Sequence, residues 1–115
     1  MNTLEILKQA IKLRKQISFE YIKEGKVDGT RIGNPYAVFI FTAKNTRIQS
    51  TKVHIVQTDG VSDSLDKNPF PSFRMYNIED LSNVQILEDE DVFGPPFHEG
   101  YNAEWDGYKD VIEKI

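Results

Sequence analysis

The sequence predicts a mainly β domain, α+β by content: a small antiparallel barrel of the SH3 or Sm type with an N-terminal and a C-terminal helix. Short segments of alternating apolar and polar residues follow one another over residues 17–87, separated by turns and not by helices, which is typical of an antiparallel sheet. About six short strands in such a span favour a curled sheet or barrel, because closure removes exposed strand edges. The 115 residues are predicted to form one domain, with a core at about 4–90 and an extension at 91–115.

Residues 2–15 have the pattern of an amphipathic helix. Asn2 is a favourable N-cap, and Glu5 follows three residues later, as in a capping box. Leu7 and Ile11 are spaced to share one apolar face, which we expect to pack against the sheet.

The strand pattern is interrupted at three places. Gly33-Asn34-Pro35 is expected to break a strand, because proline has no amide hydrogen to donate to a ladder. Residues 59–72 are predicted to be a long polar loop that two prolines hold extended, and residues 77–83 a link with room for one helical turn. The predicted strands cover residues 17–22, 30–32, 36–42, 48–58, 73–76 and 84–87.

Residues 103–115 are predicted to form the C-terminal helix. Trp105, Tyr108, Ile112 and Ile115 would lie on one stripe of it. This stripe is expected to cap the barrel. The alternative is a homo-oligomer contact through Trp105 and Tyr108, because these residue types are enriched among interface anchors.

Composition and charge exclude several classes of protein. The chain has no cysteine, which rules out disulfides and thiolate metal sites. It has neither a leader-like N-terminus nor an apolar run near the ~18 residues that span a bilayer, so we expect a cytoplasmic protein without a membrane partner. The net charge is −4, but residues 1–52 hold ten Lys or Arg against four Asp or Glu, and residues 76–115 hold two against eleven. The acidic total argues against broad nucleic-acid binding and leaves room for a local basic patch.

One arginine stands out as a candidate ligand-binding residue. Arg74 lies between Phe73 and Met75 on a predicted strand, so its side chain points to the opposite face from theirs. On a pocket wall it could clamp a phosphate or carboxylate, whereas the alternative is a salt bridge to the acidic tail. Residues at neighbouring strand ends are expected to line the same concave face. The full candidate set is Arg74, Arg31, Tyr36, Gln57, Asp59 and Ser62, with a surface charge at Arg31 and a core position for Tyr36 as the alternatives.

No catalytic set, cofactor motif or metal motif is assembled in the sequence. His54 and His98 are the only histidines, and they lack the spacing of a zinc site. The Asp59–Ser64 loop and the acidic run at 88–91 have oxygen ligands for a cation but do not follow the EF-hand pattern. We therefore predict a noncatalytic protein without a cofactor.

Three segments resemble the WYL domain, a small barrel of the Sm/SH3 type preceded by a helix. Residues 7–21 resemble its opening helix and F-x-Y strand, residues 31–36 its Pro-aromatic segment, and residues 73–78, Phe-Arg-Met-Tyr-Asn-Ile, its F-R-L-x-x-I strand. The Trp-Tyr-Leu triplet that names the family is absent, and residues 52–55 read Lys-Val-His-Ile in its place. The helix-turn-helix that usually precedes WYL domains is absent too, so the likeness is to a divergent stand-alone member.

The resemblance implies a regulatory module that senses an anionic ligand, either a nucleotide or single-stranded nucleic acid. Two alternative functions, from other classes of protein, stay open. The first is a protein-interaction or oligomerisation module. The second, with less support, is a hydrolytic enzyme that uses the Asp59–Ser64 cluster.

Overall fold

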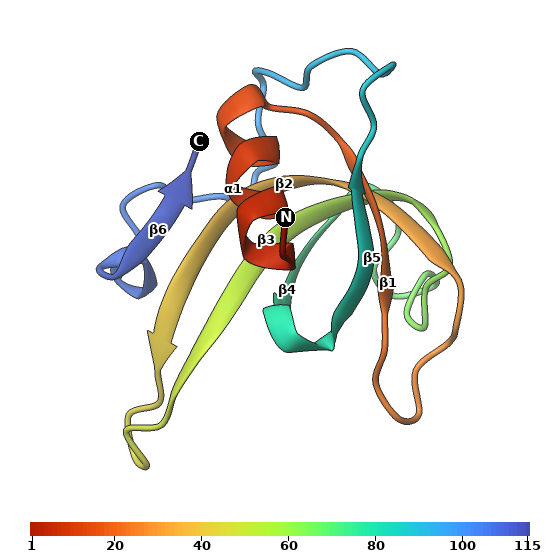
Figure 1. Ribbon diagram of the computed structural model, residues 1–115. Coiled ribbons are helices and arrows are strands. Elements are labelled where there is room, and N and C mark those ends of the chain that lie inside the picture. Colours follow the sequence, from red (N-terminus) through yellow and green to blue (C-terminus); the bar gives the residue numbers. More distant parts are fainter.

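The computed structural model describes residues 1–115 as six antiparallel strands in one open sheet, with a single α-helix (Figure 1). The mainly β prediction is thereby confirmed. The strand order is β4-β3-β2-β1-β5, and β6 pairs with the far part of β2; closure into a barrel is not confirmed. The elements are α1 (Thr3–Leu13), β1 (Ile17–Tyr21), β2 (Thr30–Thr42), β3 (Gln49–Gly60), β4 (Ser72–Asn77), η1 (Ile78–Asp80), β5 (Leu81–Ile86), η2 (Asp106–Tyr108) and β6 (Val111–Lys114).

The helix α1 covers the inner face of the curled sheet (Figure 1). The side chain of Asn2 caps its first turn, because Oδ1 accepts a hydrogen bond from the amide of Glu5 at 2.9 Å. Leu7 and Ile11 are buried in one core with apolar side chains from β1 to β5, as the helical spacing predicted. No helix of the structure is long and apolar enough to cross a membrane.

The long strands β2 and β3 form the spine of the sheet, and β2 runs through the segment that we expected to break it. The register shifts between Ile32 and Gly33 and again between Pro35 and Ala37. Such bulges absorb a proline and bend the strand instead of ending it. A Cβ at Gly33 would lie 2.6 Å from Ile55 Cγ2, so glycine permits the close approach of β3 at the bend.

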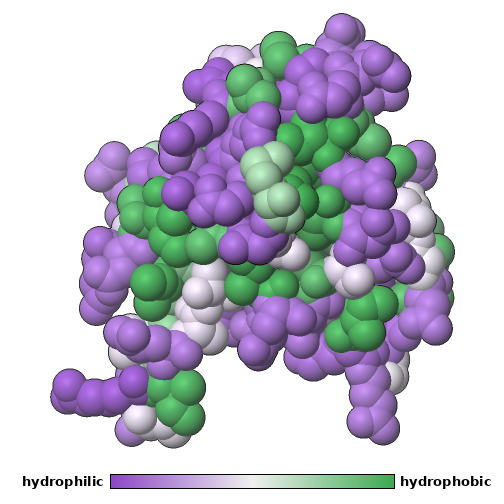
Figure 2. All heavy atoms as spheres, in the orientation of Figure 1, coloured by the Kyte–Doolittle hydropathy of each residue, from purple (hydrophilic) through white to green (hydrophobic).

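The prediction of a C-terminal helix was wrong. Residues 106–108 form one 3-10 turn, and residues 111–114 form β6 on the edge of β2 that β1 leaves free. The amide of Ile40 donates to the Asp110 carbonyl and that of Ile115 to the Tyr36 carbonyl, each at 3.0 Å. Pairing with an open edge satisfies backbone groups on both strands, and this outweighs a local helical pattern. Figure 2 shows that the two hairpin tips, after β1 and after β2, protrude from the body and are mostly hydrophilic.

Glycine is required where β3 ends. Gly60 has φ +94, and a Cβ there would lie 2.7 Å from Arg31 Cα and still closer to the Thr30 carbonyl oxygen. Gly25 has φ +82 with nothing within 4 Å. Gly25→Ala should therefore cost about 1 kcal/mol of unfolding free energy, and Gly60→Ala at least about 3 kcal/mol. Urea unfolding of both variants measures the difference, and equal losses would contradict the close packing of β3 on β2.

Candidate functional site

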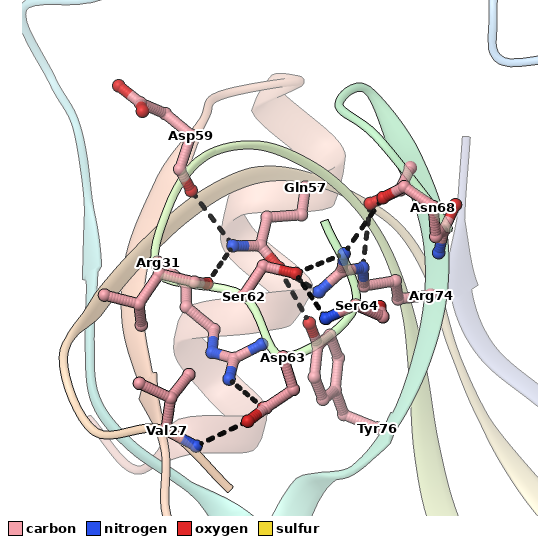
Figure 3. A network of polar contacts seen from close by, with 12 residues as sticks. Val27, Arg31, Gln57, Asp59, Ser62, Asp63, Ser64, Asn68, Arg74 and Tyr76 are labelled. Carbon is pink, nitrogen blue, oxygen red and sulfur yellow. Dashed lines mark hydrogen bonds and ion pairs between the residues drawn. The ribbon is translucent and has the colours of Figure 1, made fainter. Parts of the chain in front are cut away.

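The chain turns back over the inner face of the sheet directly after β3. Gln57 is buried there, and its amide nitrogen donates to the carbonyls of Asp59 at 3.0 Å and Val61 at 2.8 Å. These bonds hold the chain as it leaves the strand. The loop at residues 61–71 then lies over β3 and β4 (Figure 3).

Arg74 on β4 ties this loop to the sheet. Its Nε donates to Ser72 Oγ at 2.7 Å and its Nη1 to Gln57 Oε1 at 2.9 Å. Nη2 donates to Ser62 Oγ at 2.8 Å and, at 3.4 Å, to the Asn68 carbonyl (Figure 3). All of these acceptors are neutral. The guanidinium therefore has fixed geometry while its charge has no carboxylate partner, and the salt bridge to the acidic tail does not form.

Arg31 on β2 provides a second guanidinium beside the first. Its side chain is 2% exposed, and its Nη2 lies 3.2 Å from Asp63 Oδ2. Its Nε is buried without a hydrogen-bond partner, and the group lies over the Tyr21 ring at 5.3 Å. Such an unpaired buried donor is uncommon in folded proteins.

Asp63 is the carboxylate that this loop adds to the site. Its Oδ1 accepts a hydrogen bond from the Val27 amide at 2.9 Å. That bond lowers the pKa of Asp63, and the hydrogen bond and positive charge of Arg31 lower it further. Asp63 thus stays ionised and joins the loop to the β1–β2 hairpin.

A cavity of about 300 Å³ opens between these groups. Three cations, Lys26, Arg31 and Arg74, line it against the single carboxylate Asp63, in a chain whose net charge is −4. The rest of the wall comes from Tyr21, Ser64, Asn68, Met75 and Tyr76. The cavity is therefore a local positive site on an acidic protein, which favours an anion.

The structure brings together most of the residues that the sequence singled out. Arg31 and Arg74 line one cavity, and Gln57 and Ser62 hold Arg74 in place. Asp59 takes part only through its backbone carbonyl, because its carboxylate accepts from the amide of Gly60.

Tyr36 lies elsewhere. It stacks on Phe93 at 5.6 Å, and its hydroxyl accepts a hydrogen bond from the His98 amide at 2.9 Å, inside the aromatic packing of the C-terminal extension. The core position is thus the one it takes. Sequence reasoning missed Lys26 and named Asp63 only as a member of the Asp59–Ser64 cluster, because only the folded loop brings the two residues beside Arg31.

Some oxygens of the candidate cation sites are engaged in other contacts. Asp63 pairs with Arg31, and the carbonyls of Glu88 and Glu90 accept hydrogen bonds from Lys15 Nζ at 3.1 and 2.7 Å. No group of three or more His, Asp or Glu side chains gathers in a way that could hold a metal ion. His98 bonds to the Pro71 carbonyl and to the amide of Gly100.

A second buried polar pair lies on the outer face of β3. His54 points to the face opposite Gln57, and its Nδ1 lies 2.5 Å from the Tyr108 hydroxyl. Burial lowers the pKa of His54 to about 4 and raises the pKa of Tyr108. At neutral pH the imidazole is therefore uncharged and the phenol is protonated.

Comparison of the chain with protein-family models, with curated proteins and with solved structures finds no match. The function therefore has to be argued from the site itself.

The lowered pKa of His54 predicts a loss of stability in acid. An unfolded histidine binds its proton near pH 6.5, whereas the folded one resists until about pH 4. The contribution of His54 to the unfolding free energy is therefore complete above pH 6.5. It is lost as the pH falls toward 4, and the loss is about 2–3 kcal/mol.

Urea unfolding across this pH range measures the loss, with His54→Gln and His98→Gln as a pair. The His54 variant should lose this part of the pH dependence, and the His98 variant should keep it. An identical pH dependence in wild type and His54→Gln would contradict the assignment.

Proposed function

We propose that this chain is a noncatalytic regulatory module that binds a small anionic ligand in the cavity formed by Lys26, Arg31 and Arg74. The observation that carries the proposal is the charge of that cavity, with three cations against one carboxylate on an acidic chain. Two guanidinium groups at one cavity suit an anion such as a phosphate, because both keep their positive charge at any physiological pH.

Preorganisation supports binding at this cavity. Arg74 is held by four hydrogen bonds to neutral acceptors, so little side-chain freedom is lost when a ligand arrives. An anion would balance the charge of Arg74, which no carboxylate neutralises.

The wall of the cavity favours a nucleotide, or a short single-stranded nucleic acid, over a simple inorganic anion. Tyr21 lines it as a partly exposed ring and packs edge to face on the buried Tyr76, with ring centroids 4.9 Å apart. A base can pack against the exposed part of Tyr21 while its phosphate meets the guanidinium groups. A volume of about 300 Å³ suits one nucleotide and not a duplex.

The same cavity argues against the hydrolytic alternative. Its only carboxylate, Asp63, is held by Arg31 and by the Val27 amide, and its lowered pKa makes it a weak base. No histidine lines the cavity. The chemistry there is suited to binding.

The resemblance to a divergent WYL domain is part of the same proposal. Arg74 stands in the Phe-Arg-Met-Tyr-Asn-Ile segment that resembles the family strand, and the curled sheet would be an open form of the family's barrel in a cytoplasmic protein. The oligomerisation alternative has less support, because Tyr108, one of its two anchors, is buried within its own chain.

Lys26→Gln tests the proposal with little risk to the fold, because Lys26 is exposed and lines the cavity. The matched control is Lys23→Gln, an exposed lysine of the same hairpin turn outside the cavity lining. AMP and a short oligothymidylate are titrated against each protein by calorimetry at low and moderate salt. Loss of one phosphate contact should weaken binding about tenfold. It should also reduce the slope of log K against log salt concentration by about one.

Wild type and the Lys23 control should bind alike. Absence of binding by wild type at low salt would overturn the proposal, and so would an equal loss of affinity in the two lysine variants.

A further inference from the structure

A second cavity, of about 240 Å³, lies where the C-terminal extension crosses the outer face of β3 and β4. Strand alternation separates it from the cationic cavity, because Phe73 and Arg74 are neighbours on β4 and point to opposite faces. No residue lines both cavities. The second cavity is lined by His54, Phe73, Gly100, Asn102, Trp105 and Tyr108.

Most of this lining is aromatic. The His54 ring centroid lies 4.7 Å from that of Phe73 and 5.4 Å from that of Trp105. Trp105 and Tyr108 meet edge to face at 5.2 Å. Trp105 is 38% exposed, so part of its indole is free for contact with another molecule. Ring faces and edges in this arrangement suit a flat, apolar guest.

Two glycines make room beside the aromatic rings. A Cβ at Gly100 would lie 3.1 Å from both Phe73 Cβ and His98 Nδ1, and a Cβ at Gly107 would clash with the Trp105 ring. Bare backbone at these positions leaves open the space that side chains would fill, and it lets the indole lie flat against the chain.

The polar atoms of the cavity are hydrogen-bond donors. The Tyr108 hydroxyl has His54 Nδ1 as its one hydrogen-bond partner. We assign the phenol as the donor to Nδ1, which places the ring proton of His54 on Nε2. Asn102 Oδ1 already accepts from the Glu104 amide at 3.0 Å, which leaves the Asn102 NH2 group to donate. None of the lining residues is a Lys, Arg, Asp or Glu.

We infer that this cavity binds a small, uncharged planar ring whose edge carries hydrogen-bond acceptors. The ring faces pack against Trp105 and Phe73, and the edge accepts from Asn102 and His54. The cavity offers an anion no partner, because none of its lining residues carries a positive charge. This site is independent of the anion site on the other face of the sheet.

Nicotinamide is the probe, because it is uncharged, planar and carries two acceptors. Trp105 is the only tryptophan of the chain, so its fluorescence reports on this cavity, and the NMR shift of the Gly100 amide provides a second readout. We expect saturable binding in the millimolar range, on the order expected for so small a ligand.

Asn102→Asp is the decisive variant. The substitution keeps the side-chain oxygen that accepts from the Glu104 amide and removes the NH2 group that donates. The fold is retained, because Asn102 is exposed. Nicotinamide affinity should fall at least tenfold, whereas Asn45→Asp on the distant hairpin tip and Lys26→Gln should leave it unchanged. No saturable change in either readout for wild type, equal affinity in Asn102→Asp, or benzoate binding as tightly as nicotinamide would each overturn the inference.

Discussion

The protein is organised around a positive charge that has no negative partner. The Arg74 guanidinium holds the loop after β3 against the sheet through neutral acceptors, two of which, on Gln57 and Ser72, are buried. Buried acceptors that lose their donor are costly, so this arginine contributes to the fold as well as to the site. Its charge stays unbalanced, whereas the charge of the neighbouring Arg31 is paired with Asp63. The same contacts therefore position the loop and leave the cavity ready for an anion.

The alternation of β3 and β4 lets two strands support two chemically different surfaces. Gln57 and Arg74 point to the inner face, where the polar network lies, whereas His54 and Phe73 point to the outer face. The C-terminal extension covers the outer face and buries a neutral imidazole among aromatic rings. Strand β6 completes this cover by pairing with the edge of β2. A short chain without disulfides thus obtains a second packed layer from a segment with little regular structure.

Local patterns predicted the parts of the structure that local forces determine. The helix, its Asn2 cap and strands β1, β3, β4 and β5 follow from spacing and alternation, and the nearness of Arg31 to Arg74 follows from strand ends that meet. The strand count does not, because two predicted strands form the single strand β2 and β6 lies in a predicted helix. The C-terminal helix failed because strand pairing with β2 is a nonlocal interaction that no periodicity reports. The break at Gly33–Pro35 failed because bulges keep the ladder in register beyond the proline. Asp63 could not be placed, because its partner depends on how a long loop folds.

The coupling between Arg74 and Ser62 tests most directly whether this arginine holds the loop to the sheet. A double-mutant cycle of Arg74→Ala and Ser62→Ala, with unfolding free energies from urea titrations, measures it. Since Ser62 belongs to the loop and Arg74 to β4, the account predicts a coupling energy of about 1–2 kcal/mol. Two losses that simply add, within about 0.3–0.5 kcal/mol, would show that the loop is held by other contacts and would contradict the account.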